Sequence, residues 1–179
     1  MIVKNVVVLG LLASMASVQA QECKDSTTIG SWLSGEAVAD NPDGEDYAAD
    51  SGSMLMLGCT VFLDKSYRYT GNLSVGYRYQ LDKSGKGRNS GWAAEGGVSA
   101  NFGGLMLGVG AIYQFKAEVR DYFGARTKIE PSFGGFVSAG IALGPGLELQ
   151  VRRHYLTLES ESGDAYEPAE YGVFLHRSF

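Results

Sequence analysis

The stretch RRHYLTLESES holds the residue best suited to catalysis. His154 could act as a general base if a hydroxyl nucleophile lay beside it. Thr157 offers a hydroxyl, but on a strand it would face away from His154, since side chains alternate between the two faces. We therefore expect no catalytic residue, and His154 is the only candidate.

Metal, phosphate and cofactor sites are not indicated either. His154 and His176 lie in separate segments without a cysteine or carboxylate at ligand spacing. The Gly-rich stretch KSGKGRNSG lacks the G-x-x-x-x-G-K-[ST] pattern of a phosphate loop. The acidic stretch DNPDGEDYAAD matches no EF-hand spacing, so a solvated loop explains it better than calcium does. We expect no cofactor and no bound metal.

A period of two residues runs through most of the chain and predicts β-strands. From Tyr67 to Gln80, odd positions are mostly large and apolar, whereas even positions are polar or Gly. Strands are expected at residues 28–38, 54–63, 67–80, 92–102, 105–119, 128–143, 147–158 and 169–179. The first two alternate less cleanly, and the seventh places Arg153 on its apolar side.

The connections between the expected strands alternate between long and short. Turns around DKS, GG and GPG end the second, fourth and sixth strands, and longer polar segments follow the first, third, fifth and seventh. Outer-membrane barrels show this alternation, with short periplasmic turns and longer extracellular loops. The sequence therefore predicts an all-β fold, an eight-stranded antiparallel up-and-down transmembrane β-barrel.

The composition of the two faces indicates which one meets lipid. A soluble lipocalin-like barrel, which would bind a small apolar ligand inside, would have its apolar face in the interior. Here the polar face mixes small residues with charges of both signs, which suits a narrow lumen better than a solvated exterior. The expected lumen charges are Arg68, Arg78, Glu95, Lys116, Glu118, Glu130, Glu148 and Arg152. We expect them to pair with one another in a lumen filled by side chains, because an unpaired buried charge is costly.

Tyrosines are spaced like the two aromatic girdles of a membrane barrel. Tyr69 and Tyr77 are eight residues apart, and Tyr67 and Tyr79 are twelve apart. At ~3.3 Å per residue and ~45° tilt these separations project to about 19 and 28 Å, which bracket the ~25 Å apolar band of such barrels.

The start of the chain reads as a secretory signal. Lys4 supplies the positive charge, Val6 to Leu12 the apolar core, and Val18-Gln19-Ala20 a small-residue cleavage site. We expect a signal peptide at residues 1–20 and an outer-membrane β-barrel domain at residues 21–179. A disulfide between Cys23 and Cys59 is permitted in an oxidising compartment, and two free cysteines are the alternative.

The end of the chain, YGVFLHRSF, resembles the C-terminal strand signal of Gram-negative outer-membrane proteins. The matching residues are Tyr171, Gly172, Leu175 and Phe179, whereas Arg177 stands where that family usually has an aromatic or apolar residue. With the signal peptide, the strand number and the loop alternation, the chain resembles small OmpA/OmpX-type barrels over nearly its whole expected mature length. This resemblance implies a monomer in the bacterial outer membrane, recognised by the barrel-assembly machinery.

A second resemblance concerns the segment around His154, which is similar to that of outer-membrane lipid A deacylases. Their His-x-Ser pair and a downstream Glu form a hydrolytic triad. The resemblance would match His154 to that histidine and Glu167 or Glu170 to the acid, but Leu156 holds the position of the serine here. We therefore expect a non-enzymatic structural, adhesive or surface-interaction role in the Gram-negative envelope. The alternatives are a lipid A-modifying hydrolase around His154, a narrow channel, or the soluble exported barrel.

The charge of the chain suggests partners at the membrane surface. With 15 Lys and Arg against 20 Asp and Glu, it gives no case for nucleic-acid binding. Two of the longer loops are acidic and two lean basic. We expect the basic side, with Lys83, Lys86, Arg88 and Arg126, to contact lipopolysaccharide phosphates, and the acidic side to meet divalent cations or a protein.

Overall fold

The computed structural model describes residues 23–34, 37–39, 47–66, 68–82, 88–120, 126–156, 158–159, 165–166 and 169–179. Within these segments the regular structure consists of strands, and they contain no helix that is long and apolar enough to cross a membrane. The expected signal peptide and the residues Tyr67, Lys83, Lys86 and Glu167 lie outside the described segments.

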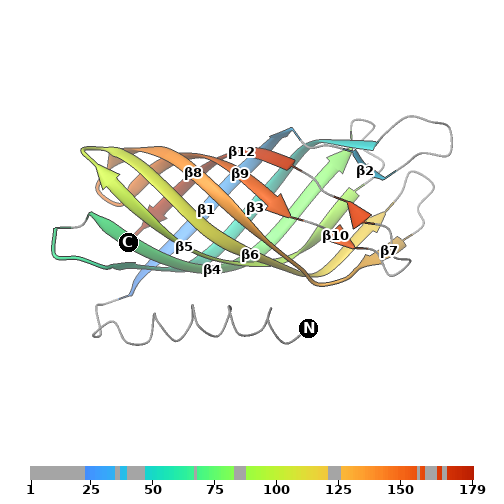
Figure 1. Ribbon diagram of the computed structural model, residues 1–179, viewed down its shortest axis with the longest axis horizontal. Coiled ribbons are helices and arrows are strands. Elements are labelled where there is room, and N and C mark those ends of the chain that lie inside the picture. The colour runs from blue at the N-terminus through green and yellow to red at the C-terminus, as the bar shows by residue number, and fades with distance from the viewer. Residues whose placement is uncertain are drawn as a thin grey trace.

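Eight long strands form the wall of a barrel (Figure 1). They are β1 (Lys24–Ser34), β3 (Tyr47–Phe62), β4 (Tyr69–Asp82), β5 (Arg88–Phe102), β6 (Leu105–Arg120), β8 (Ser132–Gly144), β9 (Leu147–Leu156) and β12 (Ala169–Ser178). Each strand runs antiparallel to its neighbours, and β1 closes the barrel because it pairs with both β12 and β3. The predicted eight-stranded antiparallel barrel is confirmed.

The two rims of the barrel differ as the loop lengths predicted. The short strands β2 (Ala37–Ala39), β7 (Arg126–Ile129), β10 (Leu158–Glu159) and β11 (Ala165–Tyr166) gather at one rim, on the right in Figure 1. The tight turns and the C-terminus lie at the opposite rim. Gly103, Gly104 and Gly146 in these turns have positive φ angles, which glycine adopts without steric cost.

The turn from β3 to β4 is held by a carboxylate. Asp64 accepts hydrogen bonds from the hydroxyl of Ser66 and, at 2.8 Å, from the backbone N–H of Tyr69. The backbone N–H of Leu63 donates to the carbonyl of Tyr69 at 2.8 Å. The hydrogen bond from Ser66, and to a smaller extent that from Tyr69, holds the pKa of the Asp64 carboxyl below its usual value.

The outer face of the barrel is apolar and the inner face is mixed. Val109 is 55% exposed on the outside of β6, whereas Ile112, three residues later, is 1% exposed inside. Leu57 is 58% exposed, and its neighbour Met56 is fully buried in the interior. The stretch around β3 was apolar on both faces in the sequence because its methionines fill the lumen.

The aromatic residues expected in the girdles lie along this outer face. Tyr69 and Tyr77 are exposed there, and Tyr79 is half-buried. Other large exposed rings share the face: Trp92, Phe102, Tyr113, Phe133, Tyr155 and Tyr171.

A β-bulge in β6 overturns the expectation that Lys116 and Glu118 point into the lumen. The register with β5 shifts between Ser90 and Trp92, and Lys116 has a left-handed φ of 49°. Two successive β6 residues therefore oppose one residue of β5, which exchanges the faces beyond this point. Ala117 is 4% exposed inside the barrel, and Lys116 is exposed outside.

Three further charges lie elsewhere than expected. Glu118 is half-buried and forms an ion pair at 3.5 Å with the exposed Arg126. Glu130 is exposed because Pro131, which has no N–H for the ladder, separates β7 from β8. Arg68 is exposed at the tight-turn rim, before β4 begins.

The two cysteines form a disulfide that joins the start of β1 to β3. Cys23 immediately precedes β1, and Cys59 lies near the end of β3, with their Cα atoms 5.6 Å apart. The neighbouring residue Asp25 pairs with Cys59 in the β1–β3 ladder. The bond therefore fastens the first strand to its neighbour at the tight-turn rim.

Candidate functional site

Three of the expected lumen charges meet in the middle of the barrel. Arg78 on β4, Glu95 on β5 and Arg152 on β9 are at most 2% exposed, because each occupies an inward position of its strand. Nη1 of Arg152 donates to Oε2 of Glu95 at 2.8 Å. Arg78 lies close enough for its charge to act on the same carboxylate. One buried carboxylate therefore faces two guanidinium groups.

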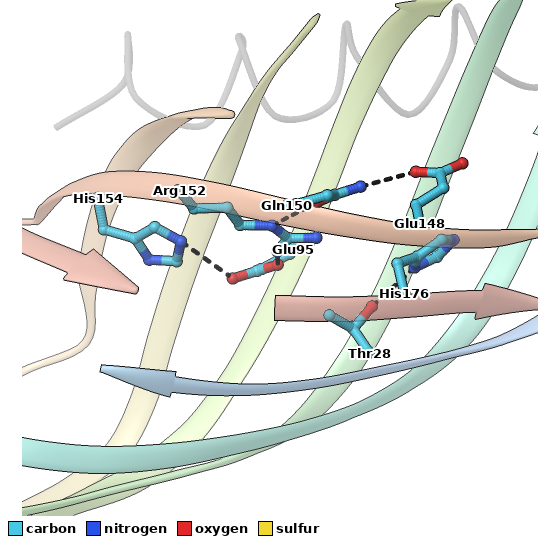
Figure 2. A network of polar contacts seen from close by, with 7 residues as sticks. All are labelled: Thr28, Glu95, Glu148, Gln150, Arg152, His154 and His176. Atoms are coloured by element: carbon cyan, nitrogen blue, oxygen red, sulfur yellow. Dashed lines mark hydrogen bonds and ion pairs between the residues drawn. The ribbon is translucent and has the colours of Figure 1, made fainter. Parts of the chain in front are cut away.

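A chain of side-chain hydrogen bonds extends from this centre along β9 (Figure 2). Nε of Arg152 donates to Oε1 of Gln150 at 2.9 Å, and Nε2 of Gln150 donates to Oε2 of Glu148 at 2.8 Å. The three residues are spaced by two along one strand, so they lie on the same inward face. Glu148 is half-buried near the tight-turn rim.

Aromatic rings cover the buried guanidinium groups. The guanidinium carbon of Arg78 lies 4.5 Å from the ring centre of Trp32. That of Arg152 lies 4.9 Å from Phe174 and 5.1 Å from Phe136. Such cation–π contacts stabilise a charge that has lost its water. Stacked aromatic and charged side chains therefore occupy the middle of the lumen.

His154 lies inside this aromatic layer and is fully buried. Its ring stacks between Phe136 at 5.3 Å and Phe174 at 6.0 Å, and meets the edge of Trp32 at 4.6 Å between ring centres. We call these four residues, Trp32, Phe136, His154 and Phe174, the aromatic plug. Nε2 of His154 is 3.8 Å from Oε1 of Glu95, and neither ring nitrogen has a hydrogen-bond partner among the described residues.

This enclosure does not suit a hydrolytic site. A general base must reach a nucleophile and a substrate, and His154 is surrounded by rings instead. Leu156, at the position of the deacylase serine, is buried and carries no hydroxyl. Glu170 lies opposite His154 in the β12–β9 ladder. Among the described residues, no group of three or more potential metal ligands occurs.

Glycines on neighbouring strands make room for the aromatic plug. Gly30 on β1 lies opposite Phe174 on β12, and a side chain at Gly30 would overlap that ring. Gly110 on β6 lies opposite Phe136 on β8 in the same way. The strand alternation alone did not single out the plug, because its aromatic residues lie on the face that reads as polar. Glycines directly across from them are the sequence signal that could have identified it.

A second histidine lies nearer the tight-turn rim. His176 on β12 is 5% exposed, and its Nδ1 is 2.8 Å from the hydroxyl oxygen of Thr28. Its Nε2 is 3.2 Å from the hydroxyl oxygen of Thr60. The structure thus places both histidines in the interior, His154 in the aromatic plug and His176 between two threonine hydroxyls.

Among the residues of the resemblance to a C-terminal signal, all four lie on β12 or directly after it. Tyr171 and Leu175 are exposed on the outer face, and Gly172 is buried beside Phe174. Phe179 follows the strand and is 63% exposed, with its N–H bonded to the carbonyl of Asp25 at 2.9 Å.

The barrel is similar to solved structures of outer-membrane proteins. No protein-family model and no curated protein matches the chain. The crystal structure of neisserial surface protein A is similar with a TM-score of 0.59 and 11% identity, over 87% of this chain and 96% of that one. The solid-state NMR structure of the outer-membrane protein AlkL is similar with a TM-score of 0.50 and 14% identity, over 90% and 92% of the two chains. The chain therefore has the fold of the small eight-stranded outer-membrane β-barrels.

Proposed function

We propose that the protein is an integral outer-membrane barrel with a non-catalytic structural, adhesive or surface-interaction role. The observation that carries this proposal is the apolar outer face of a closed barrel. Leu57, Val109 and Val151 on three different strands are each more than 50% exposed. A soluble monomer rarely exposes so continuous an apolar surface, whereas a bilayer is the solvent that suits it.

The closed lumen supports a role at the surface rather than in transport or catalysis. The ion pair of Glu95 and Arg152 and the aromatic plug fill the interior, and no described hydroxyl or thiol is hydrogen-bonded to the His154 ring. What remains available to partners is the outer face and the rim that carries the longer loops. We propose that lipopolysaccharide and the barrel-assembly machinery meet these surfaces, as the resemblance to OmpA/OmpX-type barrels implies.

The location is tested by gel mobility of the protein from outer-membrane fractions, boiled against unboiled. A closed membrane barrel resists SDS until heated, so we expect the unboiled protein to migrate differently. Recovery in the soluble periplasmic fraction without a mobility shift would contradict the proposal.

A single substitution on the outer face tests the same proposal more sharply. Val109→Arg would place a charge in the lipid-facing band, where we expect it to cost about 2–4 kcal/mol at mid-depth. Unfolding of the protein in lipid vesicles measures this cost, and Val109→Leu is the matched control with little expected change. A soluble barrel would tolerate both variants equally, because the position would face water.

A further inference from the structure

The outer face of the barrel contains one cation that interrupts its apolar surface on β9. Leu149, Val151 and Tyr155 share the outward positions of this strand with Arg153, and the three are exposed. Arg153 itself is only half-buried by its neighbours. A cation on a lipid-facing surface is unfavourable unless it reaches the interface and finds a partner there.

The guanidinium of Arg153 lies over the rings of two tyrosines, Tyr155 and Tyr171, which we call the tyrosine clamp. Its central carbon lies 4.8 Å from the ring centre of Tyr155 and 5.0 Å from that of Tyr171. Tyr171 is directly opposite Arg153 in the β12–β9 ladder, and Tyr155 lies two residues further along β9 toward the longer loops. The strand pairing therefore sets the geometry of this clamp.

Among the residues that the structure describes, the Arg153 guanidinium forms no ion pair with a carboxylate. Its Nε is buried and has no hydrogen-bond partner among the described residues. The two tyrosine rings stabilise the charge through their faces and leave its hydrogen-bonding needs unmet. An arginine presents a planar set of donors that matches a phosphate through two parallel hydrogen bonds.

The position of the clamp along the barrel suits a lipid headgroup. Exposed aromatic residues toward the longer loops, including Tyr77, Trp92 and Tyr113 on other strands, form a girdle of the type found at membrane interfaces. Because the Arg153 guanidinium packs against two such tyrosines, we expect it to lie near the membrane interface, within reach of lipid phosphates.

We propose that Arg153, held between Tyr155 and Tyr171, binds the phosphate of a lipid in the leaflet on the side of the longer loops. This inference rests on the proposed location in the outer membrane. The ligand class is a phosphate ester carried by a lipid, either lipid A or an anionic phospholipid. The site differs from the basic loop residues, because it lies within the barrel wall.

The proposal is tested with the detergent-solubilised protein and defined probes. Binding is measured by native mass spectrometry for lipid A, phosphatidic acid, phosphatidylcholine and inorganic phosphate. We expect Arg153→Gln to bind lipid A or phosphatidic acid about tenfold more weakly than the wild type, because one charge-assisted bidentate pair is lost. Arg153→Lys, which keeps the charge but not the planar donors, should recover only part of the affinity.

Arg177 provides a matched control on the same outer face. It lies over a single ring, Phe179, at 4.7 Å near the tight-turn rim, and it is exposed. We expect Arg177→Gln to keep the wild-type affinity for both anionic lipids. An equal loss in both variants would overturn the proposal, because it would indicate attraction by charge alone.

The remaining outcomes separate this site from the proposed location. A heat-dependent mobility shift in the wild type and in Arg153→Gln verifies that both are folded barrels. If both shift but the wild type prefers neither anionic lipid over phosphatidylcholine, the phosphate site is wrong and the membrane barrel stands. Inorganic phosphate that binds as tightly as the lipids would also overturn the assignment to a lipid. A preference for lipid A or for phosphatidic acid supports the site and identifies which lipid occupies it.

Discussion

At the scale of single residues, the centre of the lumen depends on one carboxylate. Glu95 forms an ion pair with Arg152 and also attracts the nearby charge of Arg78. Its Oε1 lies 3.8 Å from Nε2 of His154. Burial removes the water that would otherwise solvate these groups, so their mutual attraction must offset a large desolvation cost. The three charged residues could be anticipated from strand alternation, since a lumen charge needs a partner of opposite sign on another strand.

Glu95→Gln should destabilise the barrel strongly. It leaves two buried guanidinium groups without their carboxylate, and removing one partner of a buried ion pair costs about 3–5 kcal/mol. The free energy of unfolding in lipid vesicles, followed by tryptophan fluorescence in urea, measures the effect. Glu118→Gln is the control, because its pair with Arg126 is largely solvent-exposed and such pairs contribute about 0–1 kcal/mol. Equal losses in the two variants would mean that the lumen pair is as well solvated as the surface one.

At the scale of strands, the alternation of the sequence predicted all eight wall strands but not where their faces exchange. Apolar and polar residues that alternate with a period of two show that the two faces of a strand meet different surroundings. Long amphipathic strands can therefore be recognised without the structure. The bulge at Lys116 has no such signature, because lysine is not a residue that marks a left-handed conformation. Pro131 did offer a sign of the break between β7 and β8, since proline cannot donate to the ladder.

The bulge predicts an unusual order of stability among variants of Lys116. Because its φ is 49°, Lys116→Gly should stabilise the barrel and Lys116→Val should destabilise it, with a difference of about 1–3 kcal/mol. Lys128, exposed on the neighbouring β7, is the control. There valine should be better tolerated than glycine, because the residue sits in a regular strand. Urea unfolding of the four variants gives the comparison, and the same order at both positions would contradict the bulge.

The disulfide should stabilise the seam between β1 and β3. It encloses a segment with a sequence separation of 36 residues, for which loop-closure entropy gives a contribution of about 4 kcal/mol. We expect Cys23→Ser with Cys59→Ser to unfold at lower urea concentration and to lose its gel-mobility shift at a lower temperature. Treating the wild type with a reductant before heating should give the same change. A double variant as stable as the wild type would show that β1 is held by its ladder alone.

At the scale of the whole molecule, the closed interior and the apolar exterior divide the barrel into two environments. The sequence identified these environments because polar and apolar residues alternate, but it did not identify what fills the lumen. Phe136 and Phe174 lie on the strand face that is otherwise mostly polar. Glycines opposite them on adjacent strands leave space for their rings inside the barrel. Such packing depends on the register between strands, which is a property of the assembled barrel rather than of any segment.

A filled lumen predicts that the protein does not conduct ions. Phe174 on β12 is fully buried and Arg152 on β9 is 2% exposed, and the Arg152 guanidinium packs against the Phe174 ring in the middle of the lumen. We expect no steady conductance from the wild type in planar lipid bilayers, because an eight-stranded barrel is just wide enough to be filled by side chains. Phe174→Ala with Arg152→Ala removes two large side chains from the middle of the lumen and should produce a measurable leak.

The control for the opened lumen lies on the same two strands. Val151→Ala with Val173→Ala truncates the side chains next to Arg152 and Phe174, on the opposite face of β9 and β12. We expect this double variant to show no conductance. Both double variants must retain the heat-dependent mobility shift, because an unfolded barrel could disturb the bilayer without a pore. Steady ohmic conductance in the wild type would contradict a sealed interior and favour the narrow channel. A leak that appears only when the inward pair is removed would locate the seal at the layer where Arg152 meets Phe174.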